Sequence, residues 1–92
     1  MALKTATIRN EAGIHCRPSA VIVKVVEGYK GRVHVTAEEG AADLRSMMSI
    51  LSLGLRQGAE IAIEVIGPED ESVCSELVEL FEKEFDFPPH GS

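Results

Sequence analysis

Aromatic residues are scarce in this sequence of 92 residues, which contains no tryptophan, one tyrosine and three phenylalanines. Surfaces that bind nucleic acid usually combine aromatic side chains with a dense stripe of lysine and arginine. The sequence contains no such stripe. We therefore do not expect this protein to bind nucleic acid.

Cysteine is also rare, because Cys16 and Cys74 are the only two in the sequence. Two cysteines are too few for a disulfide scaffold. Neither a CxxC motif nor the paired Cys/His spacing of a structural zinc site is present. We expect no bound metal and no other cofactor.

Long hydrophobic runs are missing as well. A membrane-spanning helix needs a run of about 18 apolar residues or more, and the sequence has none. The first ten residues lack the apolar segment of a secretory signal. These observations predict a cytoplasmic protein without membrane association. An apolar content of 45% predicts one domain over residues 1–87, followed by a flexible tail over residues 88–92.

Charge is distributed unevenly along the chain. Residues 1–58 contain eight Lys/Arg and five Asp/Glu, which gives a net charge of +3. Residues 59–92 contain one Lys and ten Asp/Glu, which gives a net charge of −9. The acidic part is typical of a solvated helix. The mildly basic part could receive an anion or the acidic surface of a partner.

The spacing of apolar residues divides the chain into seven elements. Alternation predicts strands over Leu3–Ile8, Arg32–Ala37, Ala41–Leu44 and Glu60–Ile66. Helical spacing and end signals predict helices over Ala20–Val26, Met47–Leu53 and Glu69–Phe85. The resulting order, β-α-β-β-α-β-α, predicts an α+β fold in which helices cover one face of a single sheet.

The segment from residue 20 to residue 26 is ambiguous by composition. Its run of β-branched residues favours a strand. Pro18 near its start and Gly28 just beyond its end favour a helix instead. The residues alone leave both structures open.

The candidate site lies where the first strand leads into this segment, at the sequence GIHCRP of residues 13–18. A helix N-terminus presents unpaired N–H groups and a positive potential, which favour an anion and disfavour imidazolium. His15 is therefore expected to be neutral and nucleophilic. A phosphoryl group on its ring would meet the backbone N–H groups of Cys16 and Arg17, and the Arg17 guanidinium. On these residues alone, an ordinary surface histidine at a helix start remains an alternative.

A second motif, RSMMSILSLG, runs from Arg45 to Gly54. Ser46 and Gly54 frame a short helix in this motif, as the N-cap and as the residue after its end. Ile50 and Leu53 are expected to belong to the core.

GIHCRPSA and RSMMSILSLG together resemble the two signatures of the HPr family, the histidine phosphocarriers of the bacterial phosphoenolpyruvate-dependent sugar phosphotransferase system. The resemblance extends from residue 2 to about residue 86, with no gap between the signatures. It implies an open-faced β-sandwich with a four-stranded antiparallel sheet and three helices on one face. That fold agrees with the order read from the sequence and makes residues 20–26 helical.

The resemblance also implies a function. His15 would accept a phosphoryl group from Enzyme I and pass it to sugar-specific IIA components, with Arg17 stabilising the group. Such a protein is a carrier rather than an enzyme, and we expect it to be a monomer. Ser46 matches the serine that HPr kinase/phosphorylase modifies in species that have that enzyme.

Partner contacts are implied by the same resemblance. Met47, Met48 and Leu51 correspond to the family's apolar docking patch, although one of the three is expected to lie in the core. Lys24, on the exposed side of the first helix, is expected to attract an acidic surface of Enzyme I. Cys16 is assigned to the partner surface, and it departs from the Ala or Thr of many members.

A regulatory HPr-like protein is the alternative. It would act by binding, either in a nitrogen-type phosphotransferase relay or as a serine-switched corepressor.

Overall fold

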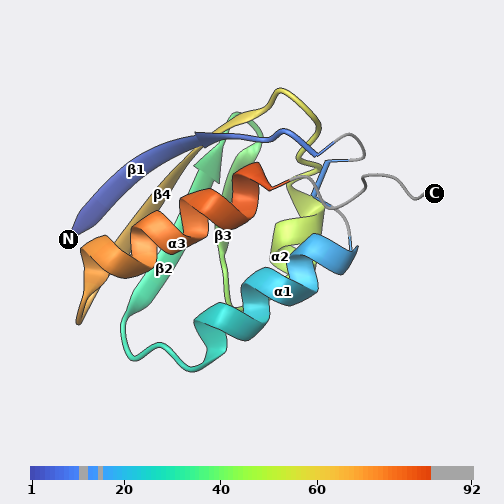
Figure 1. Ribbon diagram of the computed structural model, residues 1–92. Coiled ribbons are helices and arrows are strands. Elements are labelled where there is room, and N and C mark those ends of the chain that lie inside the picture. Colours follow the sequence, from blue (N-terminus) through green and yellow to red (C-terminus); the bar gives the residue numbers. More distant parts are fainter. Residues whose placement is uncertain (11–12, 15, 84–92) are drawn as a thin grey trace.

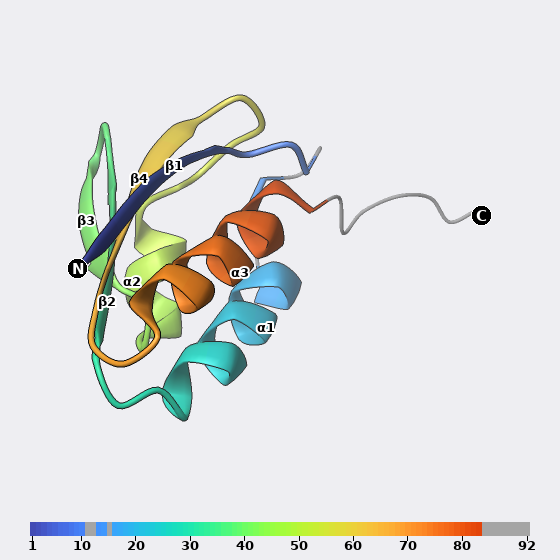
Figure 2. The same ribbon diagram turned by 60° about the vertical axis from the view of Figure 1, so that its left-hand side comes forward.

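The computed structural model describes residues 1–10, 13–14 and 16–83, with residues 16–18 described by their backbone alone. Its elements follow the expected order: β1 (Ala2–Thr7), α1 (Cys16–Glu27), β2 (Arg32–Ala37), β3 (Gly40–Asp43), α2 (Met47–Ser52), β4 (Glu60–Ile66) and α3 (Asp70–Glu82). The strands form one antiparallel sheet in the order β1-β4-β2-β3. All three helices lie on the same side of this sheet (Figures 1 and 2). The predicted open-faced α+β fold is therefore confirmed.

The element boundaries differ only slightly from those expected. β2 and β4 have the predicted bounds, whereas β1 and β3 each begin and end one residue earlier. The reason is that the alternation of apolar and polar residues indicates which side chains are buried, and not which residues pair with a neighbouring strand. Ile8 and Leu44, which follow β1 and β3, remain 1% and 0% exposed. The predicted end of the last helix at Phe85 is wrong: α3 ends at Glu82, because Lys83 is a C-cap residue with an extended backbone (φ −75°, ψ 143°). The domain limit at residue 87 and the tail lie outside the described residues.

The core fills the space between the sheet and the helices. β4 contributes one full face of three aliphatic side chains, and the helices contribute large buried residues opposite it. The most deeply buried side chains include Ile22, Val26, Val33, Val35, Ile63, Val65, Leu77 and Phe81. Each large apolar side chain buried in this way stabilises the fold by about 1.5–3 kcal/mol.

The β-branched segment of α1 shows why burial outweighs local preference. Ile22 and Val26 are fully buried, and Val23 and Val25 pack against the same core. A β-branched residue costs a helix only about 0.5 kcal/mol relative to alanine, which is less than its burial contributes. The helical interpretation of residues 20–26 is therefore confirmed, and α1 extends further, from Cys16 to Glu27.

No helix formed by the described residues is long and apolar enough to cross a membrane.

Candidate functional site

His15 and the side chains of Cys16 and Arg17 lie outside what the structure describes. Their neighbours define the setting of the site. Ile14 is the residue before His15, and α1 begins at Cys16, the residue after it. The backbone amides of Cys16 and Arg17 therefore belong to the first turn of α1, where amides have no intrahelical acceptor. The predicted helix start next to His15 is present.

A tight turn leads the chain into this position. The backbone N–H of Gly13 donates to the carbonyl oxygen of Asn10 at 2.9 Å. The side-chain Nδ2 of Asn10 donates in return to the carbonyl oxygen of Gly13 at 2.7 Å. Asn10 is completely buried. Asn10 therefore binds both the N–H and the carbonyl oxygen of Gly13.

The turn is attached to the segment between α2 and β4. The N–H of Ile14 donates to the carbonyl oxygen of Leu55 at 2.9 Å, and both side chains are buried. The N–H of Gly58 donates to the carbonyl oxygen of Ile8 at 2.7 Å. The chain before His15 is therefore joined to a segment more than 40 residues away in the sequence.

Gly13 makes this attachment possible. Its φ of +76° lies in the left-handed region, and a Cβ atom at this position would approach the Leu55 carbonyl oxygen to 2.2 Å. Only glycine fits such a close approach of two backbone segments without displacement.

Ser46 caps α2 as the sequence predicts. Its backbone is extended, with φ −109° and ψ 110°, and its Oγ accepts a hydrogen bond from the N–H of Ser49 at 3.2 Å. Gly54 lies beyond the end of the helix with a φ of +59°. The cap prediction is confirmed, whereas modification of Ser46 stays a prediction.

The expected apolar patch lies largely at the surface. Met48 is 76% exposed, and Met47 and Leu51 are half-buried. The expectation that one of the three lies in the core is therefore wrong. Ile50 and Leu53 are buried, as expected. α2 packs against α1 (Figure 1), and Lys24 is exposed on α1. The two helices therefore present apolar and basic side chains from neighbouring elements.

Cys74 belongs to the core and not to the site. It is completely buried in α3, and its Sγ donates to the carbonyl oxygen of Ile63 at 3.4 Å. Burial raises the pKa of its thiol, so the reactive thiolate is disfavoured. The described part of the chain contains no cluster of three or more His, Cys, Asp or Glu that could hold a metal ion.

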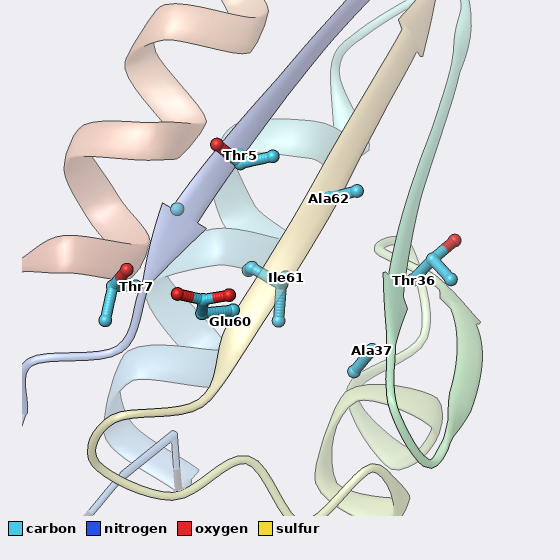
Figure 3. A pocket seen from close by; sticks show the side chains of 8 residues that line it. Thr5, Thr7, Thr36, Ala37, Glu60, Ile61 and Ala62 are labelled. Carbon is cyan, nitrogen blue, oxygen red and sulfur yellow. The ribbon is translucent and has the colours of Figure 1, made fainter.

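A separate shallow hollow of about 320 Å³ lies between β1, β4 and β2 (Figure 3). Thr5 and Thr36 both pair with Ala62 and are exposed on the face of the sheet opposite the helices. The full lining is Thr5, Ala6, Thr7, Thr36, Ala37, Glu60, Ile61 and Ala62. None of these is a predicted site residue, so the hollow is distinct from the site at the start of α1.

Two features of the site were not predicted from the sequence. Nothing in the sequence pattern assigns a role to the Asn10 side chain. The contact of Ile14 with Leu55 uses a backbone carbonyl, which has no sequence signal of its own. An asparagine three residues before a glycine is the only local sign of this arrangement.

Comparison with known proteins agrees with this geometry. Residues 3–83 match the family described as the PTS HPr component phosphorylation site. Phosphocarrier protein HPr of Chlamydia trachomatis is 40% identical over 79 residues, which are 86% of this chain and 72% of that relative. Phosphocarrier protein NPr of Escherichia coli is 30% identical over 84 residues, 90% of this chain and 93% of the relative. The crystal structure of HPr from Thermoanaerobacter tengcongensis has a TM-score of 0.81 at 30% identity, covering 88% of this chain and 91% of that one. This chain therefore belongs to the HPr family of phosphocarrier proteins of the phosphotransferase system.

Proposed function

We propose that this protein carries a phosphoryl group on His15 from phospho-Enzyme I to sugar-specific IIA components. The observation that supports the proposal most directly is the start of α1. The helix begins immediately after His15, and its first turn has no acidic side chain. The first turn of α3, in contrast, contains Asp70 and Glu71. The positive end of α1 is thus left available for an external anion.

The proposed transfer is a direct exchange between two phosphoryl carriers. A ring nitrogen of neutral His15 bonds to phosphorus while the bond between phosphorus and Enzyme I breaks. The first amides of α1 and the Arg17 guanidinium then stabilise the charge of the bound group. The same step in reverse delivers the group to the IIA component. The protein acts as a carrier in this scheme, because it is the acceptor of the group in the first transfer and the donor in the second.

Docking of these partners is assigned to the exposed parts of α1 and α2. Met47, Met48 and Leu51 supply apolar contact, and methionine adapts to partners of different shape. Lys24 supplies a positive charge for an acidic partner surface. The assignment of Cys16 to this surface stays a prediction. The monomeric state and the cytoplasmic location also stay predictions.

The test is incubation with Enzyme I and labelled phosphoenolpyruvate, followed by mapping of the modified residue. We expect an acid-labile, base-stable label on residue 15, and phosphorus NMR to identify the ring nitrogen. A label located on any other residue would contradict the site assignment.

A regulatory role is the second candidate. The match to a protein named NPr, at 30% identity over nearly its whole length, is the observation that favours it. In this alternative the protein serves a nitrogen-type relay or acts as a serine-switched corepressor. Transfer rates to IIA components from sugar permeases and from a regulatory relay, measured side by side, distinguish the two roles.

Ser46 is proposed as a regulatory site for HPr kinase/phosphorylase. Ser46 is the N-cap of α2, so a phosphate or carboxylate at this position can still accept the capping hydrogen bond. The same group adds negative charge beside Met47 and Met48. We expect Ser46→Asp to slow phosphorylation by Enzyme I about tenfold, because like charges oppose docking of an acidic partner. Steady-state kinetics with varied concentrations of the protein measure this effect.

Two variants serve as controls for this prediction. Ser46→Ala is expected to keep the wild-type rate but to lower the free energy of unfolding by about 1 kcal/mol, through loss of the cap. Ser72→Asp adds the same charge in the first turn of α3 and should leave the rate unchanged. Equal slowing by Ser46→Asp and Ser72→Asp would show that net charge alone is responsible, and the switch at Ser46 would be rejected.

A further inference from the structure

We propose that Asn10 is a positioning residue for phosphoryl transfer, an inference that rests on the function proposed for His15. Among the described residues, Asn10 and Ser19 are the polar side chains that are fully buried. The Oγ atom of Ser19 has no hydrogen-bond partner. Asn10, in contrast, donates to the Gly13 carbonyl. Its amide therefore has a defined structural task at the entrance to the site.

That task is to orient the last peptide units before His15. Asn10 bonds to both the N–H and the carbonyl oxygen of Gly13. The next residue, Ile14, is held by its bond to Leu55 and by burial of its side chain. The chain is thus fixed as far as Ile14 on one side and again from Cys16, where α1 begins, on the other. Only one residue, His15, separates these two fixed points.

Loss of the Asn10 donor would release the first fixed point. The Gly13 carbonyl would lose its buried partner, and its peptide plane could rotate to find another. Because transfer between two carriers needs an aligned approach of nitrogen to phosphorus, a small error in position lowers the rate strongly. Docking uses the exposed surfaces of α1 and α2 and should be little affected.

The test uses two variants with opposite side effects. Asn10→Asp keeps the size of the side chain and adds a charge, whereas Asn10→Ala adds no charge and leaves a space; neither can donate as the amide does. We expect both to lower kcat for phosphorylation by Enzyme I about 10- to 100-fold and to change KM less than threefold. The control for lost stability is Val35→Ala, because Val35 is buried in β2 and its truncation destabilises the fold without touching the turn. All assays are run at a temperature well below the melting temperature of each variant.

Amide hydrogen exchange supplies a readout that does not depend on phosphorylation. In the wild type, the N–H groups of Gly13 and Ile14 should exchange slowly. In both Asn10 variants they should exchange at least tenfold faster, while amides in β4 keep their protection. Unprotected amides in the wild type, or unchanged exchange and kcat in the variants, would overturn the inference even if His15 carries the label. Absence of label on His15 in the wild type would refute the proposed function instead, and the exchange result would still decide whether Asn10 holds the turn.

Discussion

Replacing His15 by alanine is expected to reduce labelling of this protein by Enzyme I and phosphoenolpyruvate to background. The alanine side chain has no nitrogen that could bond to phosphorus, and the groups proposed to stabilise the phosphoryl group, the helix amides and the Arg17 guanidinium, do not replace that bond. The loss should therefore be complete rather than partial, with radiolabel or intact-protein mass spectrometry as the measurement. Circular dichroism of the variant checks that loss of label is not caused by loss of the fold.

His34 offers the matched control for this experiment. It lies in β2, between Asp43 and Glu64 on the neighbouring strands, and it is half-buried. His34→Ala removes a histidine from a strand that is distant in the sequence from the start of α1, so labelling should persist at the wild-type level. If His15→Ala kept its label and His34→Ala lost it, the phosphoryl acceptor would have to be reassigned.

Replacing Gly13 by alanine is expected to destabilise the fold strongly. A Cβ atom would lie 2.2 Å from the Leu55 carbonyl oxygen and 3.0 Å from the Arg56 Cα. Both are backbone atoms, so the clash cannot be relieved by rotating a side chain. Together with the left-handed φ, this should lower the free energy of unfolding by about 3 kcal/mol or more. For a domain of this size the melting temperature should fall by roughly 12–24 °C.

Gly54→Ala separates the effect of the steric clash from the effect of the left-handed φ. Gly54 also has a positive φ, of +59°, but nothing lies within 4 Å of its added Cβ. Only the strain of the left-handed conformation applies there, so the cost should be about 1 kcal/mol. Thermal and urea denaturation of both variants measure the difference. Equal losses at Gly13 and Gly54 would show that the chain before His15 is not held against Leu55.

Most of the elements could be predicted because their signals are local. The alternation in β2 and β4 arises from one buried and one open face of the sheet, and both strands have the expected bounds. The serine before Met47 and the glycine after Leu53 determine where α2 begins and ends through backbone hydrogen bonding within a few residues. The two motifs also placed the candidate site at the start of α1.

α1 marks the limit of local reasoning. Five of the six residues from Val21 to Val26 are β-branched and suit a strand, and the residues alone left both structures open. Burial of Ile22 and Val26 against the core decides for a helix, because that gain exceeds the small propensity cost. Such burial depends on residues from distant elements, including Leu77 and Phe81, which no local window contains.

By itself, then, the sequence determined the order of the elements, the caps of α2 and the residues that point to phosphoryl transfer. Only the tertiary structure decided the strand order β1-β4-β2-β3, the exposure of Met48 and the attachment of the Asn10–Gly13 turn to Leu55. The physical reason is that these features depend on backbone groups and surfaces brought together from separate parts of the chain. A carbonyl oxygen is the same in every residue, so its partner can be known only once the chain has folded.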